Sequence, residues 1–339
     1  MPVSAKLRHR VSPDRTQIPA SAEGFLRELQ GPTAFGIAGR DRSRARVVVT
    51  LLHGNEPSGL RAVHAWLRSQ DTPAVDTWCV LGNVEAARMP PGFAHRMLSG
   101  RRDLNRCFLG PRDDEDGALA EEILELIREV APEAVVDLHN NSGHNPAYGV
   151  GVQRDPRTLA LVAKFARRFV LSHLNLGALM EAIRHLPSTT IEVGRAGDPE
   201  ADRVALLGLN RFLSSDDVFE PAPDPASMQV LVTPMRVCVR PDTKLAFAGE
   251  PVRDADLTIA LDLDRHNFRV LPADTPIGWA TRDRLSLELI DEDGVDRADE
   301  WFARREDLIV VRRPLIPIMI TTDPGIAVSD CLFYVVRED

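Results

Sequence analysis

Arg46-Val-Val-Val-Thr-Leu-Leu52, followed at once by His53-Gly-Asn-Glu56, is the stretch from which the fold can be argued. Its first seven residues form a short, mostly apolar and β-branched run, which predicts a strand buried on both faces. Pro57 then opens a segment of helical spacing that ends at Ser69, and proline is typical of the first turn of a helix. A buried strand followed directly by a helix is the unit from which parallel sheets are built.

The same alternation continues from about residue 35 to residue 215. It predicts an α/β fold with a mostly parallel central sheet flanked by helices, and in such sheets ligands gather at the carboxyl ends of the strands. The further strands are expected at 76–82, 134–138 and 189–193, and the further helices at 118–130, 158–169 and 200–213.

The pattern changes near residue 220. Residues 220–226 contain three prolines in seven and are typical of a stiff linker, and the runs beyond them are short, β-rich and separated by turn signals. This predicts a smaller C-terminal all-β domain. The expected organisation is an N-terminal arm at 1–34, an α/β domain at 35–219, a Pro-rich linker at 220–228 and a β-rich C-terminal domain at 229–339.

The composition excludes several classes of protein. The chain has 339 residues with 41 Lys plus Arg and 50 Asp plus Glu, a formal charge of −9. This balance argues against nucleic acid and anionic membranes as partners, because both attract basic surfaces. The apolar stretch at 308–320 is interrupted by two arginines and two prolines, so it cannot span a bilayer. No secretory signal is visible and the four cysteines are scattered, so we expect a cytoplasmic protein.

His53 and Glu56 lie where the strand at 46–52 ends. Their spacing lets an imidazole and a carboxylate point at one position, and Gly54 between them gives the backbone room to turn. Nitrogen and oxygen ligands of this kind suit Zn²⁺, which takes three protein ligands in a catalytic site and keeps a position for water. A lone His-x-x-Glu pair is common, and by itself it would be interpreted as ordinary loop polarity.

A second polar segment, Asp137-Leu-His139-Asn140-Asn141, also follows a buried strand. Because parallel strands end at one edge of a sheet, we expect His139 on the same rim as His53, where it supplies a third ligand. Alone, His139 would be interpreted as a structural histidine. Asp137 is expected to orient a metal-bound imidazole.

Glu192 lies inside the apolar strand pattern Thr190-Ile-Glu-Val-Gly194. A buried carboxylate is costly unless it is paired or has a chemical task. Beside a metal-bound water it would accept the water's proton and pass it to the leaving group. The alternative is a salt-bridged glutamate within the strand.

Asp103-Leu-Asn105-Arg106 is the fourth motif. An amide beside a guanidinium can bind a substrate carboxylate through several N–H donors. An arginine-rich loop that is merely solvated is the alternative, and Asp103 is expected to orient Arg106 or a metal-bound imidazole.

In chain order these motifs resemble the succinylglutamate desuccinylase/aspartoacylase family, a branch of the zinc carboxypeptidase-like fold. The matching segments are His53-Gly-Asn-Glu56, Asp103-Leu-Asn-Arg106, Asp137-Leu-His-Asn140 and Ile191-Glu-Val-Gly194. The resemblance covers roughly residues 35 to 215 and makes residues 35–219 a zinc hydrolase catalytic domain. The C-terminal part is similar only as a β-rich appendage of about the expected size.

The resemblance implies one Zn²⁺ per chain. It also implies that Glu192 acts as general base and then as general acid. The implied metal ligands are His53, Glu56 and His139.

The substrate side of the site also follows from the resemblance. It implies that Asn105 and Arg106 bind a carboxylate of the acyl-amino-acid substrate. Asn140 and Arg184 complete the expected substrate-binding set. The family has an arginine shortly before the glutamate motif, and Arg184 corresponds to it here at a slightly different spacing.

Two positions depart from the family pattern. The family arginine that polarises the scissile carbonyl falls on Leu98 here, so Arg96 is the favoured replacement, with Arg101 and Arg102 as rivals. The segment that resembles the family's C-terminal tyrosine region, residues 300–304, reads Glu-Trp-Phe-Ala-Arg and contains no tyrosine. N-acetylaspartate is therefore not implied as the substrate.

These expectations combine into a zinc-dependent hydrolase that cleaves the amide bond of a small N-acylated amino acid or similar carboxylate, rather than peptide bonds. The expected partner is this small anionic substrate, and the oligomeric state stays open, a homo-oligomer included. One alternative is a metallocarboxypeptidase that uses the same ligands on peptide C-termini. Another is a non-catalytic ligand-binding module on the same fold. The presence of every metal-ligand type and of the glutamate argues against this alternative.

Overall fold

The computed structural model describes residues 6–221, 227–281 and 285–338, so the centre of the expected Pro-rich linker lies outside the described residues. The chain divides into two compact units. Unit 1 comprises residues 1–140, 147–169 and 175–229, and unit 2 comprises residues 141–146, 170–174 and 230–339. Among the described residues, no helix has both the length and the apolar character needed to cross a bilayer.

Unit 1 is built on a large sheet. In the spatial order of the strands, the sheet runs β1 (Arg8–Val11), β2 (Thr33–Ile37), β4 (Val75–Leu81), β3 (Asp41–Thr50), β5 (Ala134–Asn141), β8 (Ser188–Arg195), β6 (Tyr148–Gly151) and β7 (Arg168–Leu171). The central strand β3 is buried along its apolar half and β5 along its whole length, as their β-branched runs predict.

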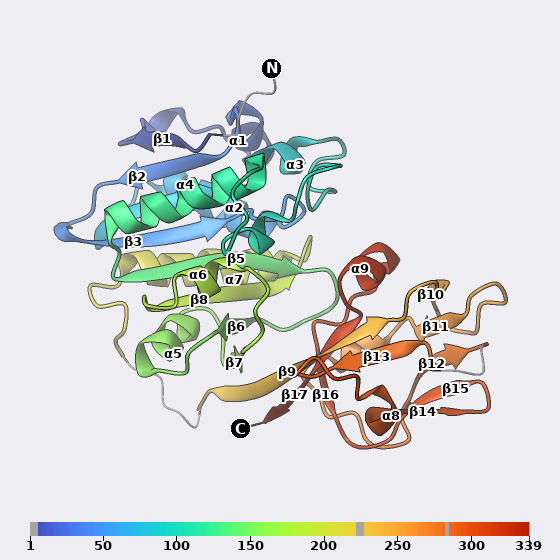
Figure 1. The fold of residues 1–339 in the computed structure, drawn as a ribbon. Helices are drawn as coiled ribbons and strands as arrows, with labels where there is room; N and C mark the ends of the chain where they lie inside the picture. The colour runs from blue at the N-terminus through green and yellow to red at the C-terminus, as the bar shows by residue number, and fades with distance from the viewer. Residues whose placement is uncertain (1–5, 222–226, 282–284, 339) are drawn as a thin grey trace. The chain divides into compact units, whose positions relative to one another are not determined.

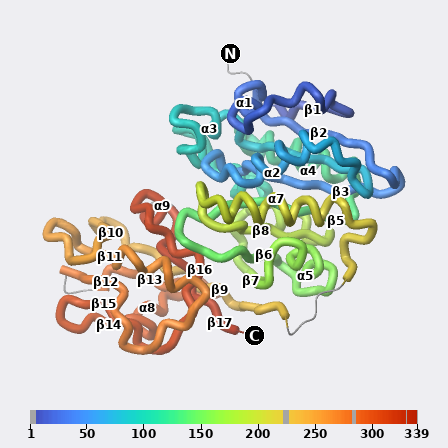
Figure 2. The backbone as a smooth tube through the Cα atoms, turned by 180° about the vertical axis from the view of Figure 1, so that it is seen from behind, coloured from blue at the N-terminus to red at the C-terminus, as the bar shows by residue number. Residues whose placement is uncertain are grey.

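Helices cover both faces of this sheet (Figures 1 and 2). The apolar side of α4 packs on alternate residues of β3, such as Val47 and Val49, in one core cluster. On the opposite face α2 packs closely, since a Cβ at Gly59 would lie 1.9 Å from the Thr50 Oγ1. The helices are α1 (Ala22–Glu28), α2 (Pro57–Ser69), α3 (Val84–Arg88), α4 (Glu115–Val130), α5 (Pro156–Ala163), α6 (Leu179–Ala182) and α7 (Pro199–Ser214).

The α/β class with flanking helices is confirmed, but the expectation of a mostly parallel sheet was wrong. β3 is parallel to both β4 and β5, whereas β2 is antiparallel to β4 and β6 is antiparallel to β8. The cause is the length of the connections. Residues 38–40 join β2 to β3 and residues 142–147 join β5 to β6, and both segments are too short for the crossover helix that a parallel return needs.

Unit 2 is β-rich and contains two groups of strands. In the first group β9 pairs antiparallel with both β13 and β17, and β17 pairs with β16. The bounds are β9 (Gln229–Val239), β13 (Leu287–Ile290), β16 (Ile316–Ile318) and β17 (Phe333–Glu338). The second group is a five-stranded sheet in the order β10 (Leu245–Ala248), β11 (Leu257–Ala260), β12 (Pro276–Ala280), β15 (Leu308–Val311) and β14 (Phe302–Arg305). The short helices of unit 2 are η4 (Leu263–His266), α8 (Ala298–Trp301) and α9 (Pro324–Ser329).

Unit 2 also includes residues 141–146, which are the last residue of β5 and the loop that follows it. The Asn267 side chain donates to the His144 carbonyl at 2.9 Å, and the His144 N–H donates to Asp264 at 3.0 Å. A Cβ at Gly143 would lie 1.9 Å from the Ile320 carbonyl oxygen, so the loop packs directly on the backbone there. The loop is therefore held by buried polar groups that are distant in sequence.

Candidate metal centre

His53 and Glu56 lie in the loop between β3 and α2. β3 ends at Thr50, and Glu56 is the residue immediately before the first helical residue, Pro57. Both side chains are buried, and the His53 Nδ1 lies 2.7 Å from the Glu56 Oε1. The strand-to-helix turn thus brings an imidazole nitrogen and a carboxylate oxygen together, as the spacing predicts.

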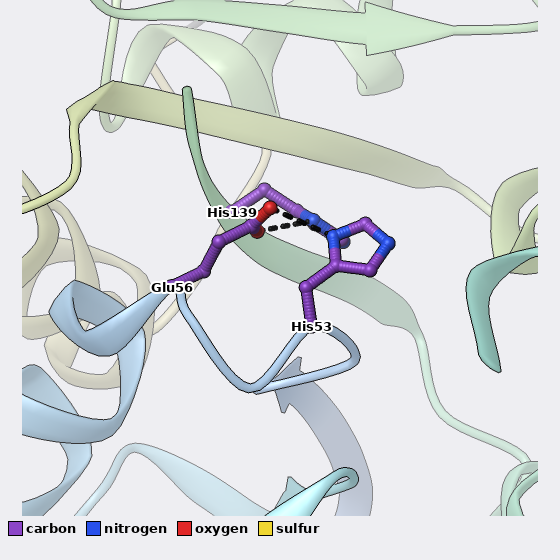
Figure 3. Close-up of side chains that lie close together, drawn as sticks. All are labelled: His53, Glu56 and His139. Carbon is purple, nitrogen blue, oxygen red and sulfur yellow. Dashed lines mark hydrogen bonds and ion pairs between the residues drawn. The ribbon is translucent and has the colours of Figure 1, made fainter. Parts of the chain in front are cut away.

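His139 reaches the same point from β5. Because β3 and β5 are parallel neighbours, with Thr50 paired to Leu138, the two strands end at the same edge of the sheet. The His139 Nδ1 lies 2.8 Å from the Glu56 Oε2, and Figure 3 shows both imidazoles meeting the carboxylate between them. One ligand atom from each of the three residues lies within 4.8 Å of the others, so the cluster could hold a metal ion.

Two further carboxylates bind the outer nitrogens of the imidazoles. The Asp137 Oδ2 lies 2.7 Å from the His139 Nε2, and the Asp103 Oδ1 lies 3.0 Å from the His53 Nε2. Such partners fix the ring orientation of metal-ligating histidines and raise their basicity. Both rings therefore present Nδ1 to the shared point, and either ring nitrogen of a histidine can bind a metal ion.

The charges of the cluster favour a cation at its centre. Burial opposes the charged form of His139, yet the carboxylates of Asp137 and Glu56 raise its pKa well above the ordinary value. Burial likewise opposes ionisation of Glu56, but His53 and His139 hold its pKa below the ordinary range. The buried carboxylates thus require positive charge between them, and a divalent cation on N and O ligands meets that requirement.

Glu192 lies on β8, buried beside this cluster. Burial raises its pKa to about 7; the charge of His139 opposes the rise and the charge of Glu56 adds to it. A buried carboxyl group that titrates near neutral pH is suited to accept and return a proton.

Arg96 is the arginine that the structure brings to the cluster. Its Nε and Nη2 donate to the Asp103 Oδ2 at 3.0 and 2.7 Å, and its Nη1 lies 3.8 Å from the Glu56 Oε1. Asp103 therefore binds Arg96 and His53 at once. The contact with His53 agrees with the expectation that Asp103 orients Arg106 or an imidazole, whereas the contact with Arg96 was not predicted.

The rival arginines point to α4 instead. Arg101 binds Asp116 through two N–H groups at 2.8 Å and also contacts Glu115, while Arg102 pairs with Asp114. These carboxylates belong to the beginning of α4, where negative charge is favourable. The guanidinium groups of Arg101 and Arg102 therefore form ion pairs at the start of α4 and not with the cluster.

Comparison with known proteins agrees with this geometry. Residues 44–212 match the model of the succinylglutamate desuccinylase/aspartoacylase catalytic domain. Over these residues the chain belongs to the succinylglutamate desuccinylase/aspartoacylase family. Membership indicates a deacylase of this type. No curated protein sequence matches the chain significantly.

Several solved structures share the fold. Succinylglutamate desuccinylase/aspartoacylase from Rhodobacter sphaeroides is 16% identical with a TM-score of 0.60, covering 90% of this chain and 88% of that one. Succinylglutamate desuccinylase from Vibrio parahaemolyticus is 14% identical with a TM-score of 0.58, covering 94% and 95%. Murine aminoacylase 3 is 18% identical with a TM-score of 0.55, covering 89% and 97%. At these identities the likeness establishes the fold alone.

Asn105 and Arg106, the two residues expected to bind a substrate carboxylate, lie in the short helix η2 (Leu104–Arg106). Asn105 is buried and its Oδ1 accepts the Leu179 N–H at 3.1 Å. Arg106 donates through Nη1 to the Asn105 carbonyl at 3.1 Å, and its charge helps to lower the pKa of Asp103. The pair therefore lies beside the carboxylate that binds His53 and Arg96.

The side chains of Asn140 and Arg184 have other contacts. The Asn140 amide accepts the Ser58 N–H at 3.0 Å and donates to the Gly194 carbonyl at 3.1 Å, so it joins the start of α2 to β8. Its backbone N–H donates to the Glu56 Oε2 at 3.1 Å and so helps to orient this carboxylate of the cluster. Arg184 is exposed and donates to the Glu181 carbonyl at 3.1 Å.

Two residues have roles that the sequence did not predict. One is Gly54, which was expected to give the backbone room to turn: its N–H donates to the Arg96 carbonyl at 2.8 Å, and a Cβ there would lie 2.6 Å from the His95 carbonyl oxygen. Gly54 is therefore required for close packing rather than for an unusual turn. The other is Glu181, whose only sequence signal is an acidic residue early in a short helix.

Proposed function

We propose that this chain is a zinc-dependent hydrolase that cleaves the amide bond of a small N-acylated amino acid or a similar carboxylate. The observation that carries the proposal is the buried cluster of His53, Glu56 and His139 in a member of a deacylase family. Two imidazoles and one carboxylate are a ligand set typical of catalytic zinc. When bound there, zinc would supply a Lewis acid and lower the pKa of a water molecule.

Glu192 would move the proton in this reaction. Its position beside the cluster and its burial support this role, because a carboxyl group with a pKa near 7 can take a proton from the attacking water and return it to the departing amine. General acid–base work of this kind contributes about a hundred- to ten-thousand-fold to the rate.

Arg96 would stabilise the negative charge that develops on the scissile carbonyl oxygen. Asp103 binds its guanidinium through two N–H groups, so the positive charge is already in place before the reaction. Asn105 and Arg106 would bind the substrate carboxylate and align the amide with these groups.

A substrate panel tests the proposal. The zinc-loaded protein is incubated with N-acetyl and N-succinyl derivatives of aspartate and glutamate, with their α-carboxamides, and with peptides whose C-terminus is free or blocked. We expect amine release from the small acids, loss of activity with a chelator and recovery with zinc. Preference for free-ended peptides would instead indicate a metallocarboxypeptidase, and a protein that binds no zinc would indicate a non-catalytic module.

A further inference from the structure

Glu181 is a buried carboxylate that the proposed reaction does not use. Its side chain is 2% exposed, and its oxygens accept the backbone N–H groups of Leu176 at 3.0 Å, Gly177 at 2.7 Å and Ala178 at 3.2 Å. A buried carboxylate is costly unless polar partners replace water, and here three consecutive N–H groups do so. Glu181 therefore determines the path of the backbone at 176–178.

The segment that Glu181 holds packs on the carboxylate-binding pair. The Leu179 N–H donates to the Asn105 Oδ1, and the Phe108 N–H donates to the Gly177 carbonyl at 3.0 Å. Gly177 has a φ of +81°, and a Cβ there would lie 2.5 Å from the Arg106 carbonyl oxygen. The backbones of Gly177 and Arg106 are thus in direct contact. Gly177 also has a backbone conformation that only glycine adopts without strain.

This packing sets the direction of the Asn105 amide. Its oxygen is committed to Leu179, so the NH₂ end, on the other side of the same planar group, carries the donors available to a ligand. Arg106 is bound in turn to the Asn105 carbonyl. Because the Arg106 backbone lies against Gly177, a shift of residues 176–179 would turn the Asn105 amide and also displace the backbone that carries the guanidinium.

We propose that Glu181 is a positioning residue for Asn105 and Arg106, because it fixes the segment at 176–179 on which the pair rests. The claim that the pair binds a substrate carboxylate rests on the function proposed above. The claim that Glu181 fixes the pair rests on the contacts alone. The two claims are tested by separate measurements.

Hydrogen exchange tests the contacts without any substrate. In Glu181→Gln the size is kept, but the NH₂ group cannot accept the N–H donors that the lost oxygen bound. We expect the Phe108 N–H, which reports docking of the pair on Gly177, to exchange about tenfold faster. Asp155→Asn is the matched control, because Asp155 accepts the Arg157 and Thr158 N–H groups at the start of α5. It should leave Phe108 unchanged.

Kinetics test the positioning role. With the panel acid that the wild-type protein hydrolyses fastest, Glu181→Gln should raise KM about tenfold and leave kcat within about twofold, because binding of a remote carboxylate weakens equally in ground and transition states. For the corresponding α-carboxamide the KM should change little. A purely structural role would lower the folded fraction, and with it the apparent kcat, at constant KM.

The outcomes separate the two claims. Unchanged exchange at Phe108, or an unchanged KM in an active variant, would overturn the role of Glu181. A wild-type protein that hydrolyses no acid of the panel would overturn the proposed function, while the exchange measurement would still decide whether Glu181 fixes the pair. If Glu181→Gln is too unstable to purify, Glu181→Asp, which keeps the charge on a shorter side chain, replaces it with the same expected direction.

Discussion

Among single residues, Glu192 gives the sharpest test of the proposed chemistry. Glu192→Gln keeps the size of the side chain but removes the group that accepts and returns a proton. Because Glu192 is not one of the three clustered ligand residues, metal content should stay at the wild-type level. We expect kcat to fall by about a hundred- to ten-thousand-fold, measured beside elemental analysis of the same sample.

His139→Ala should give the opposite pattern and serves as the control. It removes the imidazole that contacts the Glu56 Oε2, and with it one of three ligands, so zinc content itself should fall. Full turnover in Glu192→Gln would mean that another group moves the proton. Full zinc content in His139→Ala would place the metal elsewhere.

The sequence predicts the juxtaposition of the candidate metal ligands well, because position along a strand determines which edge a residue reaches. His53 follows β3 and His139 lies near the end of β5, and these parallel neighbours end at the same edge. The bridging by Asp103 could not be predicted in the same way. It depends on a loop that returns Arg96 to the cluster, and no periodic pattern encodes the course of a loop.

At the scale of elements, the close contact between Gly54 and the segment that carries Arg96 leaves no room for a larger side chain at position 54. An added Cβ at Gly54 would lie 2.6 Å from both the Ala87 nitrogen and the His95 carbonyl oxygen, which are backbone atoms that cannot turn aside. We expect Gly54→Ala to lower the free energy of unfolding by about 1–3 kcal/mol, as overpacking does elsewhere. Denaturant unfolding measures this change.

Gly92 in the same loop provides the matched control. A Cβ there would meet only the Ala87 carbonyl oxygen at 3.7 Å, an ordinary contact. Gly92→Ala should therefore leave the free energy of unfolding within about 0.5 kcal/mol of wild type. If both variants were equally stable, the segment would not be packed on Gly54 as the structure has it.

Elements with strong periodicity were predicted closely, and short ones were not. The helix expected at 57–69 is α2 with the same bounds. The helix expected at 158–169 runs too far, because α5 ends at Ala163 and Arg168 begins β7. The apolar residues after Ala163 fit a helix face and a buried strand equally well, and only the sheet that β7 joins decides between them.

At the scale of the whole molecule, the order along the chain does not define the two units. The sequence indicates one change of character near residue 220, whereas unit 2 also includes residues 141–146 and 170–174. Such insertions leave no signal in composition, because the inserted residues are few. Their contacts with distant groups, such as the Asn145 Oδ1 that accepts the Met319 N–H at 3.2 Å, become visible only in the fold.

This organisation predicts that the isolated fragment 230–339 does not reach the fold that it has in the full chain. Without residues 141–146, the buried side chain of Asn267 loses the His144 carbonyl and that of Asp264 loses the His144 N–H. Asn267 keeps the Asp264 carbonyl and the Ile320 N–H, so it loses one hydrogen bond of three, whereas the Asp264 carboxylate loses its His144 donor. A hydrogen bond lost from a buried group costs about 0.5–3 kcal/mol, which matters in a domain of this size. We expect poorly dispersed amide NMR spectra and no cooperative thermal transition.

A second fragment distinguishes this cause from a general dependence on the rest of the chain. Residues 141–146 joined to the fragment by a Gly-Ser linker restore the partners of Asn267 and Asp264 without restoring unit 1. We expect sharper spectra and a measurable transition from this fusion, and Asn267→Ala within it should remove the gain. A fragment 230–339 that folded cooperatively by itself would show that the contiguous C-terminal domain suffices and that the inserted loop is dispensable.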